Sequence, residues 1–511
     1  MSLPSGVVSS PNATERRIQS AAARLLNRWS PLIVSNRAPY EAIHDGGFNR
    51  GSGGLATALL SLAEATDAPW LACARTPRER VLAGENGPVT VALQGRPKVT
   101  LHYADPGRRV YSLYYSTIAN PLLWFLQHYL WDLPREPMLD QHQHTAWTDG
   151  YVAVNRLMSE RVVELVGLSK REPLLLTQDY HLYLLPRLVR RLRPEITMQH
   201  FVHIPWPAAD YWKVLPEQMR NAIFDGLLAN DVIGFQTERD VRRFLVGCEE
   251  LLGLRTDYQE RAVLHRGRVS WVRPYPISID VPGLSHLAAS PAVRREEDRI
   301  AAWKIEKLIV RVDRTDPAKN MLRGFAAYGL LLQRHSELRG RVQFWAFLQP
   351  SRQDVPTYRE YLWEIKQSVL RINGLFRTPG WLPIRLEIAE NIERAIAAYK
   401  NYDVLLVNSI YDGMNLVAKE GSLLNRRQGV LVLSENVGAW EELGQDAITI
   451  NPFDVEATTA ALYQALTLPH DERAGRASRL RATVKANDIA HWTERQFADL
   501  RELVGRPAHG W

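Results

Sequence analysis

The chain has 511 residues, of which 46% are hydrophobic, so it is long enough for two or three domains with large packed cores. Lys and Arg outnumber Asp and Glu by 63 − 56 = 7, and this small, dispersed excess suits anionic substrates rather than a dedicated nucleic-acid binder. Two cysteines, Cys73 and Cys248, cannot form a disulfide framework or a cysteine-based zinc site, which indicates a reducing compartment.

Residues 1–29 are predicted to form a polar tail and then a helix, because apolar residues recur at helical spacing over 14–29. The tail lacks the basic region, apolar core and cleavage site of a signal peptide. No apolar run in the chain approaches the ~20 residues that cross a bilayer. We therefore expect a cytoplasmic protein without a membrane segment.

Beyond residue 30, short apolar runs alternate with amphipathic segments of roughly 12–20 residues. Apolar runs with little polar alternation are typical of strands buried on both faces of a parallel sheet. The sequence therefore predicts the α/β class, built from strand–helix units. The predicted strands include the runs at 32–34, 174–176, 201–204, 232–235, 308–310, 344–348, 404–407 and 430–433.

An extended, proline-containing stretch over 270–283 indicates a domain boundary. We predict a Rossmann-like domain over 30–285 and a second over 286–485, facing each other across a cleft. The C-terminal segment 486–511 contains a predicted helix, 488–503, that is a candidate to cross back to the first domain. Ligands of such sheets bind outside the carboxyl ends of the strands, so the polar residues after each run are site candidates.

The first such residues are Arg37, after the run 32–34, and the glycine-rich turn 51–54, which opens a helix. Glycines let the backbone approach an anion, the helix N-terminus offers free N–H groups, and arginine matches phosphate oxygens. These residues fit a phosphate site, and they fit an ordinary strand-to-helix turn equally well.

Asp179 and His203 follow the next two strands. Asp179 could accept hydrogen bonds from sugar hydroxyls, or it could cap the following helix, predicted over 182–192. Prolines 205 and 207 fix the backbone after His203, which is either a rigidly held site residue or a structural histidine.

In the second half of the chain, Arg314 and Lys319 lie in the turn that connects a predicted strand to the next predicted helix. Two cations at a helix N-terminus could balance a departing diphosphate, and the alternative is a solvated loop with a local Arg–Asp pair.

The segment 409–420 follows the strand that ends near Asn408. Gly413 permits close backbone approach, and the N–H groups of Met414 to Leu416 are first-turn donors. Glu420 could bind a ribose. Alternatively, Asp412 is an N-cap and Glu420 an exposed helix residue.

The common motifs of metal, P-loop and serine-hydrolase sites are missing from the sequence: HExxH, a Cys/His metal set, Gly-Lys-Ser/Thr and GxSxG. The missing P-loop argues against an NTPase. An arginine cluster at 187–193 is the sole hint of nucleic-acid binding, and the basic end of a solvated helix accounts for it.

Taken in order, these clusters resemble the trehalose-6-phosphate synthase family of retaining glycosyltransferases, family 20, over about residues 32–503. The string from Asp412 to Glu420 is the most specific match. The other matching motifs lie at 35–37, 53–55, 114–124, 179–182, 203–205, 233–237 and 451–454.

The resemblance implies the GT-B fold, with two facing Rossmann-like domains. It also implies transfer of glucose from a nucleotide-glucose to glucose 6-phosphate, with retention and without a metal, giving trehalose 6-phosphate. Our prediction therefore includes neither a metal nor a cofactor, with a nucleotide-sugar as co-substrate. In this family the departing phosphate oxygen, rather than a carboxylate, deprotonates the acceptor.

By the same resemblance each candidate residue receives a role. The acceptor site would contain Arg37, Tyr115, Trp124, Asp179 and Arg352, the last lying in a strand-end loop. The donor site would contain Gly54, Arg314, Lys319, Asp412, Met414, Asn415, Leu416 and Glu420. The residues closest to the reacting atoms would be His203, Asp179, Arg314 and Lys319.

Several departures from the family pattern keep other readings open. The loop 37–53 is long, 72–75 reads Ala-Cys-Ala-Arg, Asn320 follows Lys319, and Trp206 follows Pro205. The segments 206–212 and 314–320 also resemble a pseudo-glycosyltransferase branch that joins cyclitols through a C–N bond. The alternatives are therefore a glucosylglycerol-phosphate synthase, a validoxylamine-type pseudo-glycosyltransferase and a catalytically silent sugar-phosphate sensor. The donor nucleotide (UDP, GDP or ADP) and the oligomeric state, with a homo-oligomer allowed, stay open.

Overall fold

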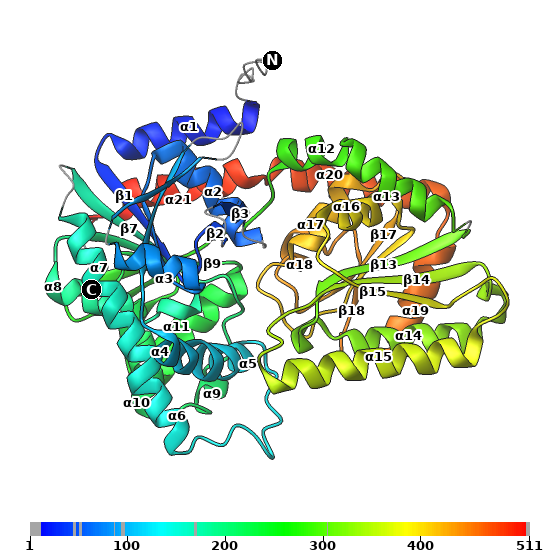
Figure 1. The fold of residues 1–511 in the computed structure, drawn as a ribbon, viewed down its shortest axis with the longest axis horizontal. Coiled ribbons are helices and arrows are strands. Elements are labelled where there is room, and N and C mark those ends of the chain that lie inside the picture. Colours follow the sequence, from blue (N-terminus) through cyan, green and yellow to red (C-terminus); the bar gives the residue numbers. More distant parts are fainter. Residues whose placement is uncertain are drawn as a thin grey trace. The chain divides into compact units, whose positions relative to one another are not determined.

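The computed structural model describes residues 12–43, 47–50, 54–85, 87–92, 98–167, 171–303 and 305–506. The chain forms two compact units (Figure 1). Unit 1 contains the chain up to Gln127, Trp131–Ile277 and the C-terminal segment from Ile489. Unit 2 contains His128–Leu130 and Ser278–Asp488.

Unit 1 is built on a ten-stranded sheet whose strands from β12 to β6 run parallel, while β5, β10 and β11 are antiparallel at its edges. A separate antiparallel hairpin joins β2 (Tyr40–Ala42) to β3 (Phe48–Arg50). The order across the large sheet is β10 (Thr256–Asp257), β11 (Ala262–His265), β12 (Arg268–Pro274), β9 (Val232–Phe235), β8 (Thr197–Phe201), β7 (Glu172–Gln178), β1 (Trp29–Ser35), β4 (Trp70–Cys73), β6 (Val99–Ala104) and β5 (Val89–Val91).

The helices of unit 1 connect these strands and include two wider helical segments, Leu113–Leu123 and Ala146–Val152, and a short 3-10 turn at Tyr180–Leu182. The regular helices are α1 (Ala13–Leu26), α2 (Gly54–Thr66), α3 (Pro77–Gly84), α4 (Arg108–Ser112), α5 (Trp124–Gln127), α6 (Gln141–Thr145), α7 (Ala153–Val166), α8 (Leu185–Leu192), α9 (Ala209–Trp212), α10 (Glu217–Leu227), α11 (Glu238–Leu252) and α21 (Ile489–Leu503).

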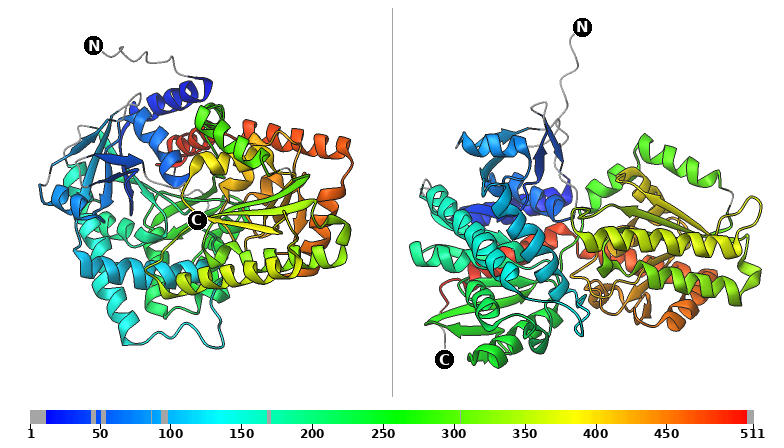
Figure 2. Two further views of the ribbon diagram at one scale, coloured as in Figure 1. Left: turned by 45° about the vertical axis from the view of Figure 1, so that its right-hand side comes forward. Right: turned by 60° about the horizontal axis from the view of Figure 1, so that its bottom comes forward.

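The C-terminal helix α21 packs within unit 1 beside α1 (Figure 2). Arg17 of α1 and Glu494 of α21 form an ion pair at 2.6 Å. The Gln199 amide of β8 donates to Gln496 at 2.8 Å, and the Tyr275 hydroxyl donates to Asp499 at 2.8 Å. The last helix is therefore an integral part of this unit.

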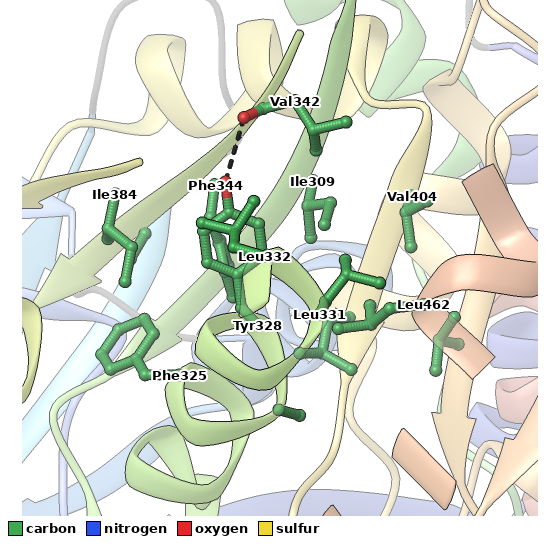
Figure 3. Close-up of a cluster of buried hydrophobic side chains, with 14 of the residues drawn as sticks. Ile309, Phe325, Tyr328, Leu331, Leu332, Val342, Phe344, Ile384, Val404 and Leu462 are labelled. Carbon is green, nitrogen blue, oxygen red and sulfur yellow. Dashed lines mark hydrogen bonds between the residues drawn. The ribbon is translucent and has the colours of Figure 1, made fainter. Parts of the chain in front are cut away.

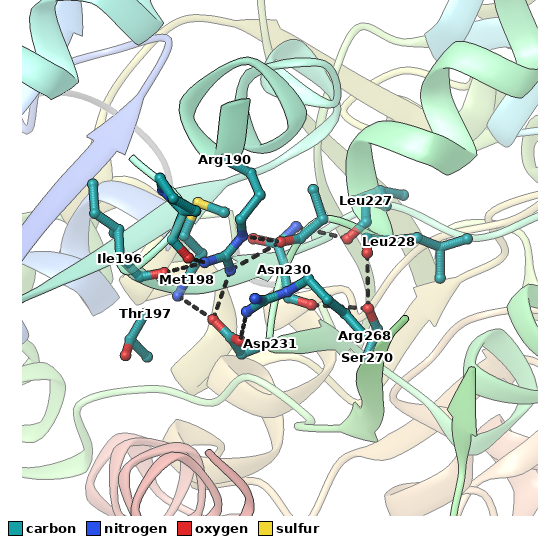
Figure 4. A network of polar contacts seen from close by, with 12 residues as sticks. Arg190, Ile196, Thr197, Met198, Leu227, Leu228, Asn230, Asp231, Arg268 and Ser270 are labelled. Atoms are coloured by element: carbon teal, nitrogen blue, oxygen red, sulfur yellow. Dashed lines mark hydrogen bonds and ion pairs between the residues drawn. The ribbon is translucent and has the colours of Figure 1, made fainter. Parts of the chain in front are cut away.

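A buried arginine joins the ends of α8, β8 and β9 (Figure 4). Arg190 donates to the carbonyls of Ile196 and Ala229, and its guanidinium lies 2.9 Å from Asp231. Asp231 also pairs with Arg268 at 2.8 Å. The two neighbouring arginines at 187 and 193 pair with carboxylates at 225 and 195. Three arginines of the cluster at 187–193, Arg187, Arg190 and Arg193, therefore have structural partners.

Unit 2 is built on a six-stranded, fully parallel sheet with helices on both faces (Figure 1). The order is β15 (Ile384–Ile388), β14 (Val342–Gln349), β13 (Lys307–Arg314), β16 (Val404–Val407), β17 (Val430–Ser434) and β18 (Ile448–Ile450). In chain order this reads 3-2-1-4-5-6, the doubly wound arrangement. In such sheets ligands bind outside the carboxyl ends of the strands where the order reverses, which here are β13 and β16. The helices are α12 (Val281–Ala288), α13 (Pro291–Ala301), α14 (Met321–Arg334), α15 (Pro356–Phe376), α16 (Ile392–Asn401), α17 (Leu416–Leu424), α18 (Trp440–Leu443), α19 (Val455–Thr467) and α20 (His470–Ala486).

The core of unit 2 lies between this sheet and α14 (Figure 3). Ile309, Leu331 and Phe344 are fully buried there, and each large apolar side chain contributes roughly 1.5–3 kcal/mol on burial. The Tyr328 hydroxyl reaches the carbonyl of Val342 at 3.0 Å, so the one polar atom at this position is satisfied. This rigid layer positions the strand ends that carry the polar residues.

The predicted α/β class with two Rossmann-like parallel sheets is confirmed. Three element boundaries were predicted wrongly. Strand β8 ends at Phe201, so most of the run 201–204 follows the strand. The helix predicted over 182–192 is split, with α8 starting at Leu185 beside Pro186, a residue that favours a first turn. Helix α1 ends at Leu26 because Trp29 already belongs to β1. In the described ranges, no helix combines the length and apolar character that crossing a bilayer requires.

Candidate active site

In unit 2 an ion pair joins the turns that follow β13 and β16. Lys319 Nζ lies 2.5 Å from Asp412 Oδ2, and the two side chains are only 13% and 15% exposed. Burial alone would raise the pKa of Asp412, but the charge of Lys319 and its hydrogen bond outweigh burial and hold that pKa below its usual value. The carboxylate is therefore ionised and pairs with a cation.

The pairing corrects one alternative, because Asp412 is not the N-cap of α17. That position belongs to Asn415, whose Oδ1 accepts the Ala418 N–H at 3.2 Å. Asn415 adopts a left-handed conformation with φ 70°, and its side-chain amide donates to Asp412 at 2.9 Å. Asn415 thus connects the start of the helix to the ion pair.

The backbone before α17 presents free donors. The carbonyl of Met414 accepts the Ala439 N–H at 2.9 Å. The N–H groups of Met414, Asn415 and Leu416 donate to no residue in the parts of the chain that the structure describes. Three amides at a helix start, with the positive end of the helix dipole, form an anion-binding arrangement.

Glu420 lies one turn into α17 and is half-buried, which corrects the alternative of an exposed helix residue. It is hydrogen-bonded to the Tyr399 side chain, and burial raises its pKa. Glu420 lies in the helix whose start carries the free amides, so its carboxyl group could accept hydrogen bonds from hydroxyl groups of the same ligand.

A buried arginine that the sequence analysis missed fixes the Lys319 turn. Arg311, in β13, is fully buried and lies 3.0 Å from Asp313. It also donates to the Lys319 carbonyl at 2.7 Å and to Asn408 Oδ1 at 2.9 Å. The strand interior thus holds the backbone of the lysine in place.

Arg352 follows β14 and belongs to the same unit. Its guanidinium lies 3.1 Å from Asp316 Oδ2, next to the Tyr358 hydroxyl, and its side chain is 7% exposed. Burial would raise the pKa of Asp316, but the Arg352 and Arg314 charges outweigh it and lower that pKa. Asp316 therefore interacts with two cations that the family resemblance assigns to different substrates, Arg314 to the donor and Arg352 to the acceptor.

In unit 1, Arg37 contacts Tyr115, a second residue of the predicted acceptor site. The Arg37 guanidinium donates to the Tyr115 hydroxyl at 2.6 Å. The Tyr115 ring stacks on His181 at 5.9 Å, and Trp124 follows on the same helical stretch with its ring 5.7 Å from Tyr180. An exposed cation on an aromatic support is suited to a phosphate group.

Asp179 does not cap a helix with its side chain, which corrects the other alternative. Its Oδ1 accepts the His203 N–H at 3.2 Å, so it bridges the ends of β7 and β8. The residue has φ 70° and ψ 173°, a conformation that costs about 1–3 kcal/mol for a side chain with a Cβ. Strain of this kind is concentrated at functional sites.

His203 is held between two glutamines. Gln236 Oε1 accepts the Ile277 backbone N–H at 3.0 Å, so the Gln236 amide nitrogen faces His203 Nδ1, at 3.5 Å. Nδ1 is then the acceptor, and the ring proton sits on Nε2, which donates to Gln178 Oε1 at 2.9 Å. Burial lowers the pKa of His203 to about 3, so the ring is neutral at physiological pH.

The glycine-rich turn lies only partly within the described residues. Gly54 begins α2, while Gly51, Ser52 and Gly53 lie outside the described residues. Among the residues that the structure describes, no three His, Cys, Asp or Glu side chains gather in a metal-binding arrangement. The residues that sequence reasoning missed are Arg311, Asp316, Gln178 and Gln236, and for both glutamines the signal was their place at the end of an apolar strand.

The family model described as Glycosyltransferase family 20 matches residues 30–502. An alpha,alpha-trehalose-phosphate synthase [UDP-forming] of Aspergillus fumigatus is 33% identical over 484 residues, covering 92% of this chain and 96% of the relative. An E. coli structure with UDP-2-fluoro glucose bound has a TM-score of 0.81 and 28% identity, covering 93% of this chain and all of that one. A Burkholderia xenovorans synthase in complex with glucose-6-phosphate has a TM-score of 0.78 and 27% identity, covering 92% and 99%.

Proposed function

Because the chain belongs to glycosyltransferase family 20, we propose that it transfers glucose from a nucleotide-glucose to glucose 6-phosphate, with retention, and releases trehalose 6-phosphate. The family resemblance predicted from the motifs is confirmed. The observation that carries the proposal is the group around the Lys319–Asp412 pair. It combines a half-buried ammonium, an ionised carboxylate and three free amides in the turns after β13 and β16.

For the donor, we propose that its diphosphate binds the amides of Met414, Asn415 and Leu416 together with Arg314 and Lys319. Preorganised donors and cations stabilise the negative charge that develops on a leaving diphosphate. Asp412 would then turn from Lys319 to the donor sugar, and Gly54 would approach the diphosphate through its backbone. Glu420 would accept ribose hydroxyls. UDP-glucose is the donor that the names of the relatives favour.

For the acceptor, we propose that Arg37, Tyr115, Trp124 and Arg352 bind the phosphate of glucose 6-phosphate. Arg37 is supported by its exposure and its aromatic backing. Arg352 would exchange part of its interaction with Asp316 for the phosphate.

Asp179 and His203 would hold sugar hydroxyls near the reacting carbon. Because His203 is neutral and hydrogen-bonded on both ring nitrogens, its role is to orient a hydroxyl rather than to supply positive charge.

In the proposed reaction the acceptor hydroxyl attacks the anomeric carbon on the face that the diphosphate leaves. The bond from that carbon to the phosphate oxygen breaks as the new glycosidic bond forms, and the hydroxyl proton passes to a diphosphate oxygen. The products are trehalose 6-phosphate and a nucleoside diphosphate. Neither a cofactor nor a metal takes part, and the buried thiols Cys73 and Cys248 fit a reducing cytoplasm.

The experiment that tests this function is a matrix of UDP-, GDP- and ADP-glucose against glucose 6-phosphate, glycerol 3-phosphate and a cyclitol phosphate. We expect nucleoside diphosphate release and a new disaccharide phosphate mass with UDP-glucose and glucose 6-phosphate, and an α,α linkage by NMR. Product with glycerol 3-phosphate or the cyclitol alone would select one of the two alternative syntheses. If none of the acceptors led to release of nucleoside diphosphate from any of the donors, the proposal would be overturned.

A further inference from the structure

Asn320 joins three strand ends of unit 2 through its side chain. It lies between the turn Pro317–Lys319, which follows β13, and the start of α14. Its side-chain amide donates to the carbonyl of Asn408, just after β16, at 2.9 Å, and to the carbonyl of Pro452, after β18, at 2.7 Å. One amide group therefore connects the segments that follow β13, β16 and β18.

The contact between Asn320 and Asn408 is reciprocal. The Asn408 amide donates to the Asn320 carbonyl at 3.1 Å, and its Oδ1 accepts a hydrogen bond from Arg311 at 2.9 Å. The Arg311 guanidinium also donates to the Lys319 carbonyl at 2.7 Å. Asn320, Asn408 and Arg311 are at most 3% exposed, and buried polar networks of this kind rigidify the parts of the chain that they join. The backbone of Lys319 is thus held at its own carbonyl and at the next residue.

The backbone conformation of Asn320 does not explain its side chain. Asn320 is left-handed, with φ 58° and ψ 43°. Glycine and asparagine adopt this conformation more readily than other residues. Glycine would meet the backbone requirement equally well, but only asparagine adds the two hydrogen bonds to the neighbouring strand ends. This asparagine is one of the departures from the family pattern.

Gly324, in the first turn of α14, leaves room for the same network. A Cβ at this position would lie 2.8 Å from Arg311 Nη1 and 3.3 Å from Asn408 Nδ2. The Arg311 side chain could not withdraw without straining its hydrogen bonds to Lys319 and Asn408. The close approach of the helix to the buried guanidinium therefore requires a glycine here.

We propose that Asn320 is a positioning residue for Lys319. Its amide fixes the turn after β13 against the ends of β16 and β18, and so sets where the Lys319 ammonium lies relative to Asp412, now 2.5 Å away. A cation already in place stabilises a developing charge without reorganisation, and a misplacement of about 1 Å can cost about 100-fold in rate. The role rests on the proposed function, in which Lys319 acts on the leaving diphosphate.

The first test compares Asn320→Gly with the wild-type full-length chain. Glycine keeps the left-handed backbone and removes only the side-chain amide. We expect kcat to fall about tenfold or more, while the KM for glucose 6-phosphate changes less than about twofold, because Lys319 acts on the leaving group rather than on the acceptor. In a Lys319→Ala background the same substitution should change kcat less than about twofold, since Asn320 acts through the lysine. Equal losses in both backgrounds would show a merely structural role and overturn the proposal.

Two glycine substitutions in α14 form a matched pair. Gly324→Ala should displace the Arg311 guanidinium and lower kcat about fivefold or more. Gly329→Ala makes the same change five residues later, where a Cβ would contact Ile372 at an ordinary 3.5 Å, and should leave kcat unchanged. Equal rates for the two variants would show that the network does not position Lys319.

Crystal structures of the wild type and of Asn320→Gly distinguish the positioning role from the proposed function. We expect the substitution to move Lys319 Cα by about 1 Å or more relative to β16. If Lys319 stayed in place, the positioning role would be wrong even though the wild type made trehalose 6-phosphate. If Lys319 moved and the wild type made no such product, the proposed function alone would fail.

Discussion

The candidate site residues of the two units differ in how their side chains are held. In unit 2 two of the cations are little exposed and pair with carboxylates, as Lys319 does with Asp412 and Arg352 with Asp316. In unit 1 the half-buried His203 is neutral and lies between Gln178 and Gln236, and the cation Arg37 is exposed. A buried charge without a partner costs several kcal/mol, so unit 2 carries its own counter-charges, whereas unit 1 fixes orientation by hydrogen bonds. In the proposed function, the paired cation Lys319 would stabilise the charge of the leaving diphosphate, whereas His203 would orient a sugar hydroxyl.

The largest expected effect comes from removing the positive charge of Lys319 in unit 2. Lys319→Ala should lower kcat by about 10²-fold or more, because it removes a donor to the leaving diphosphate. Nucleoside diphosphate release measures the rate, and circular dichroism checks folding, since the change also leaves Asp412 buried without its partner. The double variant Lys319→Met with Asp412→Asn removes both charges. If it regained normal turnover, the loss in the single variant would be structural and the catalytic role of Lys319 would be wrong.

A more selective effect is expected in unit 1. Arg37→Ala should raise the KM for glucose 6-phosphate by about 10- to 100-fold, the worth of a charge-assisted hydrogen bond, and should change the KM for the donor little. Initial rates at varied concentrations of each substrate give both values. Arg108→Ala, at an exposed arginine nearby, is the control. An equal change in both KM values would contradict the acceptor assignment.

The neutral histidines of unit 1 should appear in the pH dependence of stability. Burial lowers the pKa of His200 and His203 to about 3, below the ordinary value of about 6.5 in the unfolded chain. Their contribution to stability is therefore full above pH 6.5 and is lost as the pH falls towards 3, by about 1.4 kcal/mol per pH unit for each ring. Urea unfolding between pH 4 and 6.5 measures the slope. His203→Gln should reduce it, and an unchanged slope would show that His203 is charged in the folded state.

The smallest effect is expected from the partner that orients His203. Gln236→Met removes a neutral hydrogen bond and should lower kcat by about two- to tenfold. Gln236→Glu should in addition raise the pKa of His203, because a carboxylate favours the charged ring, so a new limb appears in the pH–rate profile between pH 5 and 8. Selective ¹⁵N labelling of histidine reports the tautomer directly. A profile identical to that of the wild type in both variants would remove Gln236 from the mechanism.

The sequence indicated those features that are local in the chain. Arg37, Asp179, His203 and Lys319 each follow an apolar run, and parallel strands bring their carboxyl ends to one edge of a sheet. The pairing of Lys319 with Asp412 was not predictable, because the two residues are distant in the sequence and meet only when β13 and β16 lie side by side.

The capping alternatives failed for a related reason. Asp179 and Asp412 both precede helical turns, and nothing local distinguishes an acid that caps a turn from one that binds a neighbouring strand or loop. Arg311 was not predicted as a buried residue, because an arginine in a strand is expected at the surface unless the fold supplies partners for it, as Asp313, Lys319 and Asn408 do here.

The hydrogen bond from Ile277 to Gln236 has a consequence for sequence variation. The donor is a main-chain amide, so every residue type except proline keeps the hydrogen bond, whereas the Ile277 side chain is buried in the core and is constrained by packing. Homologous chains should therefore keep apolar residues of similar size at this position and exclude proline. In a library of substitutions at 277 scored for growth that depends on the product, valine and leucine should be tolerated and proline should not.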